Sequence, residues 1–166
     1  MSRYSYLFIG CFFLLISFLS FINIIYSYYF NFYLNVNSYL PPLVISFFGG
    51  IFFIFFKFKN KKLSIFDKVL FVISGYIIFP IIIALPYYFS IYDISFINSF
   101  FESISGFTST GFTTFDNVQY LDPSLILWRS TSQWVGGLYF LFSIILLINI
   151  FDNNLKKSLT NFLSFN

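Results

Sequence analysis

Four long apolar runs, separated by short polar stretches, constrain the fold of this chain more than any other feature. Hydrophobic residues fill 58% of its 166 positions and charged residues only 9%, a balance that a water-soluble globule of this size would not carry. The natural solvent for such a chain is a bilayer, where an apolar run of about 20 residues forms a spanning helix. The sequence therefore predicts an all-α membrane protein.

The first run extends from about Leu7 to Phe30, and a helix of this length covers about 36 Å, enough to cross a hydrocarbon core about 30 Å thick. Pro41 and Pro42 open the second run, where the first turn of a helix tolerates proline. Pro80 and Pro86 lie inside the third run and predict a kink supported by neighbouring helices. The four runs lie at about residues 7–30, 41–56, 69–89 and 124–150.

The stretch from Ser90 to Pro123 does not fit the pattern of these runs. A short amphipathic piece, from about Phe96 to Ser105, is too short to span a membrane and leads into a run of Thr, Ser and Gly. Irregular backbone at membrane depth is tolerated only where protein buries it or water lines it, as in a pore loop. Gly111 fits the backbone angles of a carbonyl-lined potassium filter, and the short helix would aim its negative dipole end at the pore axis.

The basic residues predict the orientation of the spans, because cytoplasmic loops carry an excess of Lys and Arg. Seven of the nine lie between Lys57 and Lys68 or at Lys156 and Lys157, so these segments and both termini are expected in the cytoplasm. Residues 31–39 and 116–123 are then external. Four of the six acidic residues fall on the outer side, where they fit either solvated loop charge or a vestibule that mildly attracts cations. These are Asp93, Glu102, Asp116 and Asp122.

Side chains that carry enzymatic chemistry are nearly absent from the chain. It has no histidine, and its one cysteine, Cys11, lies inside an apolar run, which removes disulfides, Cys/His zinc sites and Cys/His or Ser/His/Asp catalysis. The net charge of +3 is too small and too localised for a nucleic acid partner. The sequence therefore predicts neither an enzyme nor a nucleic-acid-binding protein, and membrane lipid is the expected surrounding.

Three short runs of sequence carry a resemblance to a known family. The run FFESISGFTSTGFT at residues 100–113 is followed by LWRS at 127–130 and QWVGG at 133–137. Together they resemble the first pore repeat of the Trk/Ktr/HKT potassium transporters, closest to the bacterial Trk membrane subunit. The resemblance implies an N-terminal transmembrane hairpin over residues 1–62, one pore repeat over 63–152 and a cytoplasmic tail over 153–166. Within the repeat, an outer helix, a pore helix, a filter and an inner helix follow one another.

The same resemblance assigns roles to particular residues. Backbone carbonyls of the filter would hold potassium, while pore-helix residues would support the filter from behind and inner-helix residues would permit close packing. Packing is the favoured reading of the inner-helix glycine pair, ahead of a gating hinge, and Arg129 is expected to be a structural anchor at the outer interface. The filter residues are Ser109, Thr110, Gly111 and Phe112, flanked by Thr108 and Thr113. The supporting residues are Glu102, Ser105 and Gly106, and the inner-helix residues are Gln133, Gly136 and Gly137.

The function implied is potassium uptake across the cytoplasmic membrane, with K⁺ as the transported ion and no cofactor bound. Members of the family place four repeats in one polypeptide, whereas this sequence carries one. A truncated or split transporter subunit, a single-repeat channel that forms a homotetramer and a non-conducting scaffold or remnant are therefore all open. The resemblance also implies a cytosolic nucleotide-binding regulatory subunit as a partner.

Overall fold

The computed structural model describes residues 3–56 and 64–164, and all regular structure within them is helical, which confirms the predicted all-α fold. Four of the segments are long and apolar enough to cross a membrane, so the chain is an integral membrane protein. Lys57 to Lys62 of the predicted cytoplasmic loop lie outside the described residues. The elements are α1 (Arg3–Tyr29), η1 (Tyr33–Tyr39), α2 (Leu40–Phe55), α3 (Ile65–Tyr88), α4 (Phe96–Phe107), η2 (Val118–Tyr120) and α5 (Pro123–Ser164).

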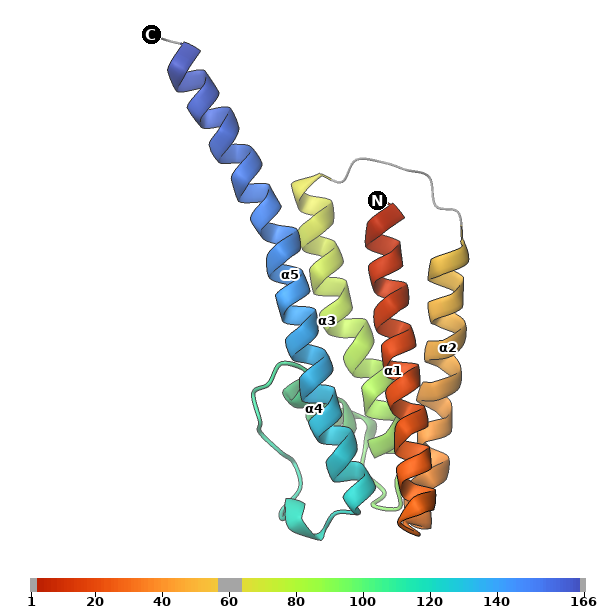
Figure 1. Ribbon diagram of the computed structural model, residues 1–166. Helices are drawn as coiled ribbons and strands as arrows, with labels where there is room; N and C mark the ends of the chain where they lie inside the picture. The colour runs from red at the N-terminus through yellow and green to blue at the C-terminus, as the bar shows by residue number, and fades with distance from the viewer. Residues whose placement is uncertain (1–2, 57–63, 165–166) are drawn as a thin grey trace.

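The long helices form a bundle that the short α4 enters from one end (Figure 1). The antiparallel hairpin of α1 and α2 packs against α3, and α5 packs against both α1 and α3. α1 begins, α2 ends and α3 begins at one end of the bundle, whereas η1, η2 and the start of α5 lie at the opposite end, here called the loop end. The two segments predicted to be external, residues 31–39 and 116–123, therefore share one end of the bundle.

Local sequence explains why α3 and α5 extend beyond the predicted apolar runs. The Ser64 hydroxyl accepts a hydrogen bond from the Asp67 backbone N–H at 3.1 Å, and the Asp67 carboxylate accepts one from the Ser64 N–H at 3.0 Å. This capping box starts α3 at Ile65, four residues before the predicted run. α5 contains neither glycine nor proline after Gly137, so it continues as a helix through the predicted tail and extends past the other helices (Figure 1).

α3 continues as one helix through Pro80 and Pro86. A proline has no N–H to bond the carbonyl four residues earlier, so each proline removes one backbone hydrogen bond from α3. The Ser103 hydroxyl of α4 donates to the Pro80 carbonyl at 2.7 Å, and the Trp128 indole of α5 donates to the Ile83 carbonyl at 3.0 Å. Neighbouring helices thus bond to the proline-containing part of α3.

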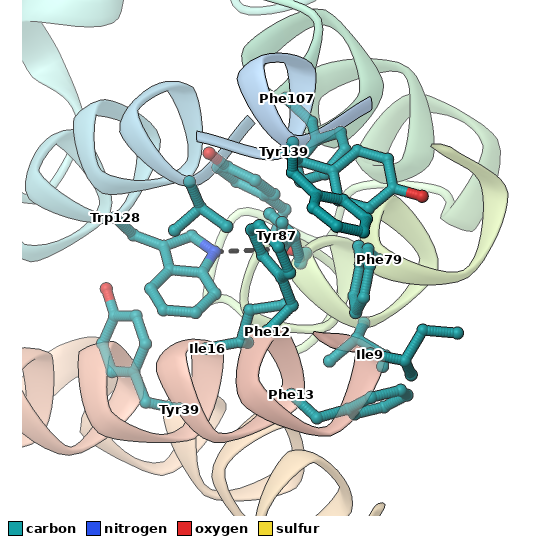
Figure 2. Packing of buried hydrophobic residues seen from close by; sticks show 14 of the residues in the cluster. Ile9, Phe12, Phe13, Ile16, Tyr39, Phe79, Tyr87, Phe107, Trp128 and Tyr139 are labelled. Atoms are coloured by element: carbon teal, nitrogen blue, oxygen red, sulfur yellow. Dashed lines mark hydrogen bonds between the residues drawn. The ribbon is translucent and has the colours of Figure 1, made fainter. Parts of the chain in front are cut away.

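Aromatic side chains from α1, α3, α4 and α5 form the core, which Figure 2 shows from close by. The Tyr139 ring lies 5.2 Å from that of Phe12 and 5.3 Å from that of Phe79, both edge-on, which is a favoured arrangement of ring quadrupoles. Phe107, at the end of α4, joins the same cluster with its centroid 5.6 Å from Tyr139. The Tyr139 hydroxyl donates to the Val72 carbonyl at 3.0 Å. The core therefore ties the N-terminal hairpin to the helices around α4.

Asp122 is buried at the loop end of the bundle. Its carboxylate accepts hydrogen bonds from the Asn35 amide at 2.8 Å and from the Ser124 backbone N–H at 3.0 Å. Its own N–H donates to the Tyr92 hydroxyl at 2.7 Å, and the Asn35 amide oxygen accepts from the Ile91 N–H at 3.0 Å. The sequence-based interpretation of Asp122 as solvated or vestibule charge is therefore wrong, because this carboxylate joins η1 to the start of α5.

Candidate functional site

α4 is a helix of 12 residues, about 18 Å long, which is too short to cross a membrane. The Ser95 hydroxyl caps its first turn by accepting from the Asn98 N–H at 3.3 Å. It runs from the loop end into the bundle, and the chain after it returns to the same end (Figure 1). Its buried face is rich in polar and small residues. These are Ser99, Glu102, Ser103, Ser105 and Gly106.

Residues 108–114, called the re-entrant loop below, turn around the last residues of α4. The backbone N–H groups of Thr110 and Gly111 both donate to the Ser105 carbonyl, at 2.9 and 3.4 Å. The Ser109 N–H donates to the Gly106 carbonyl at 2.9 Å. Ser109 and Gly111 have φ values of 57° and 86°, in the left-handed region that glycine adopts without strain. The backbone at position 111 therefore has the conformation that suits a glycine.

Glu102 of α4 lies behind the re-entrant loop and has no solvent exposure. One carboxylate oxygen accepts hydrogen bonds from the Thr113 hydroxyl and from the Thr114 backbone N–H, the latter at 3.0 Å. The other lies 3.5 Å from Nε of Arg129, an ion pair without hydrogen-bond geometry. A buried carboxylate persists only when it is paired, and these contacts supply partners that the sequence did not identify.

Arg129, in the second turn of α5, contacts the re-entrant loop directly. Its Nη2 donates to the carbonyls of Gly111 and Phe112, both at 3.2 Å, while its Nε faces Glu102. The sequence predicted an anchor at the outer interface and missed the contact with the loop. One signal pointed to it, since an arginine and a glutamate in a chain with so little charge tend to pair within a membrane protein.

The four carbonyls of the predicted filter differ in the hydrogen-bond donors that reach them. The Phe112 carbonyl accepts from the Ser105 hydroxyl at 2.7 Å as well as from Arg129, and the Gly111 carbonyl accepts from Arg129. No donor among the described residues reaches the carbonyls of Ser109 and Thr110. The sequence did not predict this division, which leaves the two earlier carbonyls free to bind a ligand.

Threonine hydroxyls brace the first part of the loop. The Thr108 hydroxyl donates to the Ile104 carbonyl at 2.8 Å and lies 2.7 Å from the Thr110 hydroxyl. All six residues from Thr108 to Thr113 are solvent-exposed in the single chain. Beside the end of α4, a cavity of about 450 Å³ adjoins the loop. It is lined by Tyr76, Phe107, Thr108, Ser109, Gly136, Gly137 and Phe140.

The two glycines of α5 have different surroundings. A Cβ at Gly136 would lie 1.7 Å from the Phe107 carbonyl oxygen, so α4 and α5 approach closely at this point. A Cβ at Gly137 would meet nothing within 4 Å, and this residue borders the cavity. Gly106 of α4 also faces α5, where its Cβ would lie 2.6 Å from the Ser132 hydroxyl oxygen. Gln133 lies half-buried in the turn of α5 before these glycines.

Four segments able to span a membrane, together with a short helix that ends in a braced, glycine-containing loop, define an all-α integral membrane protein. The chain is similar to curated cation transporters. It is 35% identical over 111 residues to an uncharacterised cation transporter of Methanocaldococcus jannaschii, covering 63% of this chain and 23% of that protein.

Two potassium uptake proteins of the Trk system are also similar to the chain. It is 31% identical over 121 residues to TrkG of Escherichia coli, covering 61% of this chain and 25% of that protein. TrkI of Halomonas elongata is 35% identical over 66 residues, which cover 40% of this chain and 12% of that protein. The resemblance to Trk-type transporters is thereby confirmed.

The chain spans about a quarter or less of the length of these curated relatives. No family model matches the chain. No solved structure matches it.

Proposed function

We propose that the chain forms one part of the wall of a cation pathway and takes part in potassium uptake across the cytoplasmic membrane as a Trk-type subunit. The observation that carries this proposal is the re-entrant loop itself. Gly111 has a φ of 86°, and the loop around it is exposed in the single chain while its rear is braced by the ion pair of Glu102 and Arg129.

The loop would act on an ion through its backbone. A potassium ion sheds its hydration shell only if oxygen ligands replace the water, and carbonyl dipoles are the ligands that potassium filters use. The carbonyls of Ser109 and Thr110 are free to do so, and those of Gly111 and Phe112 retain a further lone pair each. The C-terminal end of α4 adds the negative end of a helix dipole close to the loop.

A cation needs ligands from all sides, whereas the described residues supply one such loop. We therefore propose that further pore loops complete the pathway, either from another polypeptide or from copies of this chain in a homotetramer. The exposed face of the loop and the cavity beside Gly137 would then face these neighbours and the ion path. A cytosolic nucleotide-binding subunit is the regulatory partner that the resemblance to Trk-type transporters implies.

The test is tracer potassium uptake by liposomes that contain the purified chain with any partners that remain bound. The expected result is uptake that exceeds that of protein-free liposomes and that excess sodium does not suppress. The chain purified as a monomer, established by light scattering after subtraction of the detergent, is expected to give none. Potassium-selective uptake by the monomer would contradict the proposal that the chain forms only one part of the wall of the pathway. Absence of uptake from every assembly would favour the alternative, a non-conducting membrane scaffold.

A further inference from the structure

We propose that Arg129 is the internal counter-cation of the re-entrant loop: its guanidinium holds the carbonyls of Gly111 and Phe112 as a bound ion would, so the loop keeps its conformation when no cation is present. This inference rests on the proposed function, because it assigns a role to Arg129 within that same ion pathway. It starts from one side chain that contacts two carbonyls and a carboxylate.

The geometry of arginine allows these contacts at the same time. The guanidinium is a planar fork with five N–H donors, so Nη2 can reach both carbonyls at 3.2 Å while Nε remains 3.5 Å from Glu102. The Arg129 side chain is only 15% exposed. A lysine in this position would present a single ammonium group and could not bridge the carboxylate and both carbonyls in the same way.

The Gly111 carbonyl depends on this contact. Among the described residues, Arg129 is the one donor that reaches it, whereas the Phe112 carbonyl also accepts from Ser105. Neighbouring carbonyl dipoles held close together repel one another, and a positive group that contacts them relieves this repulsion. In a filter, the bound ion supplies the positive charge that relieves this repulsion. The Arg129 guanidinium supplies a positive charge to the same two carbonyls from the rear of the loop, where it also pairs with Glu102.

Glu102 explains how a fixed positive charge can lie beside a cation pathway. The carboxylate is fully buried and pairs with the guanidinium, so the two groups together are close to neutral. The same carboxylate accepts from Thr113 and from the Thr114 N–H, which fixes the far side of the loop. Arg129 and Glu102 therefore act together as positioning residues, neither of which needs to touch the ion.

Hydrogen–deuterium exchange of the full chain, purified with any bound partners, tests this role. The reporter amides are those of Thr110 and Gly111, which donate to Ser105, and that of Thr114, which donates to Glu102. Exchange is compared in potassium chloride and in N-methyl-D-glucamine chloride at equal ionic strength. The wild-type loop is expected to be protected in both buffers, because the guanidinium is always present.

Arg129→Gln should make these amides exchange about tenfold faster or more without potassium, since hydrogen bonds to a charged group are lost. Potassium should restore the protection, because the ion then replaces the missing charge. Arg129→Lys should fall between the two. The matched control is Ser130→Ala, whose exposed hydroxyl bonds only within α5 to the Ile126 carbonyl, and it should behave as wild type. Unchanged exchange in peptides from α1 to α3 would show that each variant is folded.

Two results would overturn the inference. Unchanged loop exchange in Arg129→Gln without potassium would show that the guanidinium does not hold the loop. Faster exchange that potassium does not reverse would show that it braces the loop but does not act in place of an ion. Failure of the proposed function is recognised separately, by absence of potassium uptake from the wild-type assembly in liposomes.

Discussion

Ser109 and Gly111 are the two residues of the re-entrant loop with a positive φ, and they tolerate it differently. A side chain in the left-handed region costs on the order of 1 kcal/mol, which the loop bears at Ser109. At Gly111 a Cβ would meet nothing within 4 Å, so the preference for glycine comes from the backbone rather than from crowding. A small side chain at position 111 is therefore compatible with folding of the chain.

Gly111→Ser should yield a folded chain whose assembly prefers potassium over sodium less strongly. The added Cβ strains the φ of 86° and is expected to rotate the neighbouring carbonyls away from their positions. The measurement is uptake of potassium in the presence of excess sodium, by liposomes or by a potassium-uptake-deficient strain that carries the complete assembly. Gln119→Ser, in the exposed η2, is the control. Unchanged sodium exclusion in Gly111→Ser would contradict the filter assignment.

At the scale of elements, the position of the re-entrant loop depends on how closely α4 and α5 approach. Gly136 allows this approach, because the Phe107 carbonyl occupies the space that a Cβ would need. Phe107 is the last residue of α4 and is also buried in the aromatic core. A displacement of α5 at this point would therefore move the start of the loop.

The neighbouring glycines of α5 provide a matched pair of variants. Gly136→Ala should destabilise the protein by about 2 kcal/mol, because the methyl group forces two backbones apart. Gly137→Ala should be neutral or stabilising by up to about 1 kcal/mol, because it meets no neighbour and alanine favours a helix. Unfolding temperatures in detergent measure both effects. Equal unfolding temperatures for the two variants would show that the close contact at Gly136 is absent in solution.

The second link between elements is the buried Asp122, which ties η1 to the start of α5. Asp122→Asn should destabilise the fold by about 1–3 kcal/mol, because an amide N–H group would then oppose the amide of Asn35. The exchanged pair Asn35→Asp with Asp122→Asn should regain part of this stability, since donor and acceptor only change places. Asp116→Asn, on the exposed loop, is the control. An exchanged pair less stable than either single variant would count against the direct contact.

At the scale of the whole molecule, two sets of segments lie at opposite ends of the bundle (Figure 1). α1 begins at the same end at which α2 ends and α3 begins, and residues 31–39 and 116–123 lie at the loop end. The distribution of lysine predicts which end faces the cytoplasm.

Single cysteines in a Cys11→Ser background test this orientation on intact cells. Asn117→Cys should react with an impermeant thiol reagent, because the positive-inside rule places the loop end outside the cell. Lys61→Cys should react only after the cells are permeabilised. The background substitution is needed because Cys11 is itself exposed on the surface of the bundle. Labelling of position 61 but not 117 on intact cells would reverse the orientation.

The local properties of the sequence determined much of the fold. Four apolar runs predicted the four spanning segments, and a short amphipathic piece followed by Thr, Ser and Gly predicted the re-entrant helix and loop. These predictions succeed because the hydropathy of a segment and its backbone conformation depend on residues that are close together in the sequence. The positive φ of Gly111 follows for the same reason. Where a helix end in the structure differs from the predicted one, the cause is also local, as with the capping box at Ser64.

The sequence by itself therefore determined that this is an all-α membrane protein with a re-entrant loop, since hydropathy and glycine content are properties of a segment. Only the tertiary structure decided which charges are buried and which carbonyls are engaged. Asn35 and Asp122 meet across 87 positions of the chain, and Arg129 of α5 reaches a carboxylate of α4 and two carbonyls of the loop. Such pairings depend on how the helices pack against one another, and the long-range packing that places these side chains has no signature in a local pattern of residues.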